Sequence, residues 1–160
     1  MKQHWRLKTT FWLDIALLVS VCALQTVRFT GLVVHEWLGL AVIAMVLAHL
    51  LFSWSWIATQ SRRLFGRQTA RERINYVLNL ILFFFVTAAL FSGILISQKA
   101  IPVLTGAVVS PDKMDMRWAT LHEEFAGMVL ILAGLHLAIN LDWVLAAAGN
   151  AFRRFRESAL

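Results

Sequence analysis

The sequence predicts an all-α integral membrane protein in which four transmembrane spans form one bundle. Hydrophobic side chains make up 59% of the 160 residues, compared with roughly 45–50% in an ordinary soluble domain. Four apolar stretches come close to the roughly 20 residues that a helix needs to cross a hydrocarbon core. Each span is expected to be helical because lipid offers the backbone no hydrogen-bond partner. The charges that flank the spans are also distributed unevenly, as in a multi-pass membrane protein.

The predicted spans follow these apolar stretches within a single domain, residues 1–160. They cover about residues 11–27, 32–57, 74–96 and 121–148. The first is the shortest and contains Asp14, which we interpret as an acid that complements the positive end of a first helical turn. A cleaved signal peptide is not expected, because no small-residue cleavage pattern follows this span.

The basic residues predict the orientation of the chain. Eleven of the fifteen lysines and arginines lie before span one, between spans two and three, or after span four. The positive-inside bias therefore places both termini in the cytoplasm. We interpret the net charge of +6 as this topological signal and expect no nucleic-acid partner. The single cysteine, Cys22, allows no disulfide within the chain.

Two of the spans carry a repeated pattern of histidines. His35 and His49 are fourteen residues apart in span two, and His122 and His136 are fourteen residues apart in span four. At about 100° per residue, this spacing falls about 40° short of four full turns, so both histidines of a span lie on one helix face, about 21 Å apart along the axis. The pattern indicates that spans one and two are repeated as spans three and four.

The predicted topology pairs these histidines across the bundle. Spans two and four run in the same direction, so His35 matches His122 near the outer surface and His49 matches His136 nearer the cytoplasm. Neutral imidazoles on opposed helices are the two axial ligands of a six-coordinate haem iron, so we expect two stacked b-type haems between spans two and four. Zinc or copper would need its ligands clustered within a few ångströms. Small residues beside the ligands would leave room for a flat macrocycle: Gly39, Gly127 and Gly134.

Charged residues near the histidines have two interpretations. Arg28 and Arg117 are expected to pair with the propionates of the outer haem, and Arg73 with those of the inner haem; alternatively, all three mark the membrane interface. Glu36 and Glu123 directly follow the outer histidines. They would take protons from a bound quinol, or they complement the helix dipole.

Several of these features together resemble a known group of proteins. They are the order of spans, the His-Glu-x-x-Gly sequence at His35–Gly39, the paired fourteen-residue spacings and the dipeptide Leu13-Asp14. Over nearly the whole chain they are similar to the small four-helix di-haem cytochromes b of bacteria, and most similar to the domain-of-unknown-function family of flavinylation-associated cytochromes. Span one has no histidine, unlike the cytochrome subunits of formate dehydrogenase and hydrogenase, so the quinone sites of those proteins are not carried over.

The resemblance implies a multi-pass protein of the bacterial cytoplasmic membrane. It would carry electrons between the quinone pool and an extracytoplasmic redox protein, flavin-carrying or similar, and an oligomer is compatible with that role. An iron with two histidine ligands has no open site for a substrate, so the chain is expected to be an electron-transfer subunit. Two alternatives remain open: a self-sufficient oxidoreductase that passes electrons between a small donor such as superoxide and quinone, and a haem-free anchoring or assembly protein.

Overall fold

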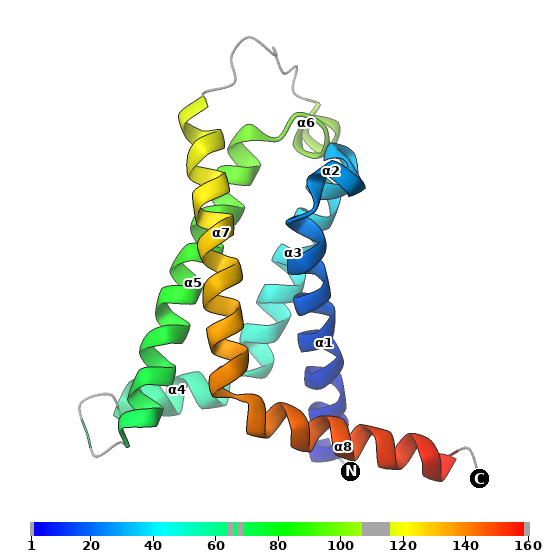
Figure 1. The fold of residues 1–160 in the computed structure, drawn as a ribbon, viewed down its shortest axis with the longest axis vertical. Helices are drawn as coiled ribbons and strands as arrows, with labels where there is room; N and C mark the ends of the chain where they lie inside the picture. Colours follow the sequence, from blue (N-terminus) through cyan, green and yellow to red (C-terminus); the bar gives the residue numbers. More distant parts are fainter. Residues whose placement is uncertain (1, 64–65, 67–68, 107–115, 159–160) are drawn as a thin grey trace.

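The computed structural model describes residues 2–63, 66, 69–106 and 116–158. Within these ranges all regular secondary structure is helical (Figure 1). The helices are α1 (Lys2–Leu24), α2 (Val27–Thr30), α3 (Leu32–Phe52), α4 (Trp54–Arg63), α5 (Ala70–Ile96), α6 (Ala100–Thr105), α7 (Met116–Ile139) and α8 (Leu141–Ser158). The expectation of an all-α fold is therefore confirmed for the part of the chain that the structure describes.

The four long helices associate as two antiparallel pairs. Helix α1 packs along α3, and α5 packs along α7, whereas contacts between the two pairs are sparse (Figure 1). Each pair consists of helices that are consecutive among the long ones, and elements that follow one another in the chain are usually neighbours in space. The pairing matches the two-helix repeat expected from the sequence, and α3 and α7 run in the same direction, as predicted.

The helices expose an apolar surface that suits a membrane. Helices α3, α5 and α7 are long and apolar enough to cross one, while the apolar part of α1, Thr9–Leu24, is shorter. Large apolar side chains point outward along these helices, for example Leu51 at 69%, Phe84 at 61% and Ile131 at 59% exposure. Water would strongly disfavour so much exposed hydrocarbon, so this surface is that of a membrane protein.

Two of the predicted spans end earlier than their apolar stretches. Ser53 interrupts the second, where α3 ends at Phe52 and α4 begins, and Asn140 interrupts the fourth between α7 and α8. Helices α4 and α8 are strongly amphipathic and lie across the end of the bundle (Figure 1). This is the arrangement of helices in the plane of a membrane interface. The predicted ends at residues 57 and 148 therefore extend each span into such a helix.

The other two spans differ from the prediction mainly at their beginnings. Helix α1 already begins at Lys2 and ends at Leu24, and α5 begins at Ala70 and ends at Ile96 as predicted. A capping box fixes the start of α5: the Thr69 side chain accepts from the Glu72 backbone, and the Glu72 carboxylate accepts from the Thr69 backbone N–H at 2.9 Å. Both orphan donors are thereby satisfied.

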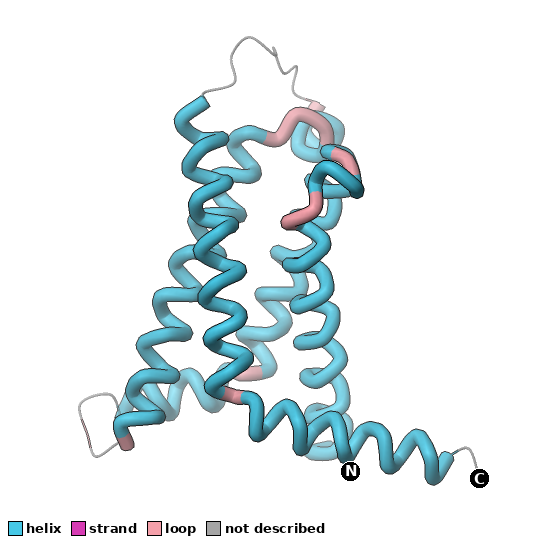
Figure 2. The backbone as a smooth tube through the Cα atoms, in the orientation of Figure 1, coloured by secondary structure: helices cyan, strands magenta, loops and turns pink. Residues whose placement is uncertain are grey.

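The loops and short helices gather at the two ends of the bundle (Figure 2). We call the end that carries α4, the start of α5 and α8 the basic end, because its arginines lie there: Arg62, Arg63, Arg71, Arg73 and Arg153. Both α1 and α8 also place the chain ends on this side (Figure 1). We call the opposite end, formed by α2 and α6, the cap end. Arg67 and Lys113 lie outside the residues described.

Gly31 makes the turn between α2 and α3 and provides a test of this fold. Its φ of 79° and ψ of 158° lie in a region that is open almost only to glycine, so Gly31→Ala should destabilise the protein by about 1–3 kcal/mol. Thermal unfolding in detergent measures the effect. Gly149→Ala is the matched control, because a Cβ on this α8 glycine meets nothing within 4 Å. Equal stability of the two variants would contradict the conformation at Gly31.

Candidate functional site

The structure brings the rings of His35 of α3 and His122 of α7 into an edge-to-face contact near the cap end. Their ring centres are 6.0 Å apart, and the ring planes are inclined at 86°. Metal–imidazole bonds are about 2.0 Å long, so two rings that ligate one ion from opposite sides have their centres about 6 Å apart. The separation of this cap-end pair is therefore compatible with a shared metal between the rings.

Each ring of the cap-end pair is held through its Nδ1 atom by a backbone carbonyl. The Nδ1 of His35 lies 3.1 Å from the carbonyl oxygen of Leu24, and the Nδ1 of His122 lies 2.9 Å from that of Ala89. A carbonyl oxygen only accepts hydrogen bonds, so Nδ1 carries the hydrogen and donates it. The lone pair of each neutral ring is then on Nε2, which is the state of a metal-ligating histidine with an oriented ring.

His49 of α3 and His136 of α7 are the second pair predicted from the sequence, nearer the basic end, and each ring is again held through its Nδ1 atom. The Nδ1 of His49 lies 2.7 Å from a carboxylate oxygen of Asp14, and the Nδ1 of His136 lies 2.6 Å from the side-chain amide oxygen of Asn79. All four histidines therefore donate from Nδ1 to an acceptor on the partner helix of their own pair, α1 for α3 and α5 for α7.

The acceptors follow the two-helix repeat as closely as the histidines do. Leu24 and Asp14 are ten residues apart on α1, and Ala89 and Asn79 are ten residues apart on α5. In both pairs, acceptors ten residues apart on one helix serve histidines fourteen residues apart on the other. The repeat thus includes the groups that orient the imidazoles as well as the imidazoles themselves.

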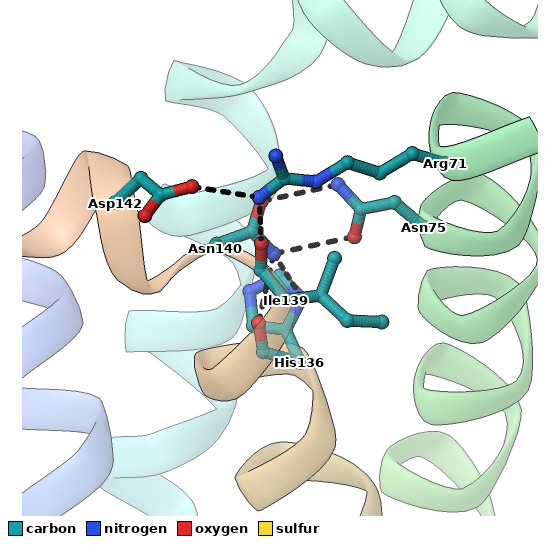
Figure 3. Close-up of polar contacts among 6 residues, drawn as sticks. All are labelled: Arg71, Asn75, His136, Ile139, Asn140 and Asp142. Atoms are coloured by element: carbon teal, nitrogen blue, oxygen red, sulfur yellow. Dashed lines mark hydrogen bonds and ion pairs between the residues drawn. The ribbon is translucent and has the colours of Figure 1, made fainter. Parts of the chain in front are cut away.

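A polar cluster lies behind His136 at the basic end (Figure 3). The side-chain amides of Asn75 and Asn140 bond each other reciprocally, at 3.1 and 3.2 Å, and the Asn140 amide also donates to the backbone oxygen of His136 at 2.8 Å. Arg71 donates to the carbonyl oxygen of Ile139 and to the Asp142 carboxylate, both at 2.9 Å. These bonds join α5, the end of α7 and the start of α8, and so support the helix turn that carries His136.

A cavity of about 680 Å³ opens beside the cap-end pair, on the side toward the cap end, and is lined by both His35 and His122. This volume is in the usual range for cofactor sites, about 300–1,000 Å³. Its lining is mostly apolar, with a few polar groups toward the cap end: Gln25, Arg28, Glu36, Gln98 and Glu123.

A smaller cavity of about 90 Å³ lies on the other side of the same two histidines, deeper in the bundle. It is lined almost entirely by apolar side chains, among them Val42, Val86 and Val129. The cap-end pair therefore has a cavity on each side. The cavity toward the cap end has polar groups in its lining, and the one toward the centre of the bundle is lined by apolar side chains. A haem has this distribution, because its propionates are at one edge of an otherwise apolar plate, and the residues present fit such a group.

Glycines make room for these features. A Cβ on Gly93 would lie 2.9 Å from Cε1 of His122, which is too close for any real contact, so only glycine lets α5 approach this ring. Gly39 lines the larger cavity. A Cβ added to Gly39, Gly127 or Gly134 meets nothing within 4 Å, and their role in making room for a macrocycle stays a prediction.

Of the charged residues predicted near the histidines, some line the larger cavity and others lie away from it. Arg28, Glu36 and Glu123 line the larger cavity, whereas Arg117, at the start of α7, is not part of its lining. Arg73 is exposed in the first turn of α5 at the basic end. The two arginines at opposite ends, Arg28 and Arg73, are thus each at the end where the corresponding propionates were predicted.

Glu36 has a structural role that was not predicted. Its carboxylate accepts hydrogen bonds from the Ser97 hydroxyl at 2.6 Å and from the backbone N–H groups of Gln98 at 2.9 Å, Lys99 at 2.8 Å and Ala100 at 2.7 Å. These donors precede or begin α6, so Glu36 caps that helix from α3. The proton role suggested for Glu36 and Glu123 stays a prediction.

Sequence reasoning missed the residues that orient the imidazoles. Asp14 was interpreted as an acid in a first helical turn, but α1 begins at Lys2, so Asp14 lies in mid-helix and has a histidine as its partner. Asn79 and Gly93 were not considered. The available signal was the polar pair Asp14 and Asn79 inside apolar stretches, since an intramembrane polar residue is expensive and usually has a partner.

Neither a cluster of metal-binding side chains nor a known relative indicates a function for this chain. Among the residues that the structure describes, no group of three or more histidine, cysteine or acidic side chains is arranged to hold a metal ion. Comparison of the chain with protein-family models, curated proteins and solved structures found no match. The functional assignment therefore rests on the geometry of the two histidine pairs.

Proposed function

We propose that this chain is a transmembrane electron-transfer protein that binds two b-type haems, one between His35 and His122 and one between His49 and His136. A haem iron with two histidine ligands exchanges single electrons and has no position open to a substrate. The two sites lie on the same pair of parallel helices, about 21 Å apart along the axis for a fourteen-residue spacing. They would form a relay between the cap end and the basic end.

The observation that carries this proposal is the common state of the four imidazoles. Each has its Nδ1 hydrogen bonded to an acceptor on the partner helix, which leaves Nε2 as the atom with a free lone pair. A histidine whose role was only to join two helices would not need to be repeated at the same spacing, with the same Nδ1 bond, on a second helix. Four rings in the same state, with a ring contact and a cavity at the cap-end pair, support two bis-histidine sites.

The chain's own residues have defined tasks in these sites. The acceptors on α1 and α5 fix the ring orientations, and Gly93 lets His122 lie against α5. Arg28, in the cavity lining, would neutralise a propionate by a charge-assisted hydrogen bond. The valines of the deeper cavity exclude water from the apolar edge of the group.

The proposed location is the cytoplasmic membrane of a bacterium, with the basic end and both termini in the cytoplasm. Support comes from the arginines gathered at that end and from the positive-inside rule. In keeping with the family resemblance, the electrons would pass between the quinone pool and an extracytoplasmic redox protein at the cap end. The exposed apolar surface of α3, α5 and α7 gives access to membrane-soluble quinone.

Haem content is the direct test. Protein purified in detergent should contain about two b haems per chain by pyridine haemochrome assay, with a low-spin reduced-minus-oxidised spectrum. His49→Ala should reduce the content to about one because one iron loses a ligand. His4→Ala is the matched control, since His4 precedes the apolar part of α1, and it should retain both. Folded but colourless wild-type protein would exclude the proposal and favour an anchoring role.

Gly93→Ala tests the geometry of the cap-end site. The new Cβ would force the His122 ring away from its position, so we expect loss or a high-spin spectrum of one haem. The haem proposed between His49 and His136 is the internal control, because Gly93 lies against His122, fourteen residues before His136. A variant with two unchanged low-spin spectra would contradict the placement of His122 beside α5.

A further inference from the structure

The two helix pairs differ in one of the groups that accept a hydrogen bond from an imidazole Nδ1. In the repeat, Leu24 corresponds to Ala89, and both supply a backbone carbonyl. Asp14 corresponds to Asn79, and each lies ten residues from the carbonyl acceptor of its own helix. Three of the four imidazoles therefore bond a neutral acceptor, and only His49 bonds a carboxylate.

The Asp14 contact is short and partly shielded. Its Oδ1 lies 2.7 Å from Nδ1 of His49, and each side chain is 30% exposed. Arg71, a cation at the same end of the bundle, is bonded to Asp142 and to the Ile139 carbonyl. The Asp14 carboxylate is thus directed at the imidazole of a proposed haem ligand, in an environment where charge is weakly screened.

We propose that Asp14 positions the His49 ring and lowers the reduction potential of the basic-end haem, making the two sites electrically different despite their identical ligands. The proposal rests on the function proposed above. A carboxylate that accepts from Nδ1 increases the electron donation of Nε2 and adds a negative charge near the iron, and both effects favour the oxidised state. A neutral amide at the same place supplies the orientation without the charge.

The repeat itself supplies the matched variants. Asp14→Asn keeps an acceptor oxygen for His49 and removes the charge, so the midpoint potential of the basic-end haem should rise. Asn79→Asp adds a carboxylate opposite His136, so the same midpoint should fall. The double exchange, Asp14→Asn with Asn79→Asp, should return it close to the wild-type value.

The measurement is an optical redox titration of the full chain in detergent. The midpoint that disappears in His49→Ala identifies the basic-end haem. The cap-end midpoint is the internal control, because its imidazoles bond backbone carbonyls, and it should stay unchanged in all three variants. A purely structural role for Asp14 would change haem content without these opposite shifts.

Each outcome has a defined meaning. Two retained haems with an unshifted basic-end midpoint in Asp14→Asn would overturn the proposal. If that variant loses one haem, Asn79→Asp decides: a lowered midpoint supports the proposal and an unchanged one overturns it. Wild-type protein without haem would instead overturn the proposed function, so the two failures are distinguishable.

Discussion

An imidazole within an apolar helix must find a hydrogen-bond partner, and the rest of this structure depends on how that requirement is met. A polar group left alone in hydrocarbon costs several kcal/mol. Here each histidine of α3 bonds an acceptor of α1, and each histidine of α7 bonds an acceptor of α5. These bonds set the register within both helix pairs. They also leave the Nε2 atom of each ring with a free lone pair. The same contacts therefore stabilise the fold and fix the orientation of the atom that would ligate a metal.

The cap end shows how the surroundings of the candidate site are connected to one of its histidines. Glu36 directly follows His35 and holds the start of α6 through four hydrogen bonds. Two of its donor residues, Ser97 and Gln98, also line the larger cavity. The wall of the cavity and the helix turn that carries His35 are therefore one hydrogen-bonded unit. A movement of α6 would be transmitted to His35 through the side chain of Glu36.

The sequence predicted the long helices, the pairing of the histidines and the common direction of α3 and α7, because apolar length and a fourteen-residue spacing are local signals. It did not predict where α3 and α7 end. The apolar composition continues through Ser53 and Asn140 into α4 and α8, and only the amphipathic pattern beyond them marks the change. The partners of the imidazoles were missed for another reason: the contact of Asp14 with His49, or of Gly93 with His122, joins residues far apart in the chain, so its existence depends on helix packing.

The sparse contact between the two helix pairs affects how such a protein is assembled. Hydrogen bonds join the halves near both ends, from Glu36 to residues 97–100, from Gln25 to the Ala126 carbonyl and between Ser61 and Tyr76, but the long helices of the two pairs make few direct contacts with each other. On the proposed function, the prosthetic groups would add two further links between the halves, since each iron would take one ligand from each half. Any group that binds the folded form alone stabilises it by mass action. The amount of intact protein in a cell would then follow the supply of haem, and a chain made without it would be exposed to proteolysis as two loosely joined hairpins.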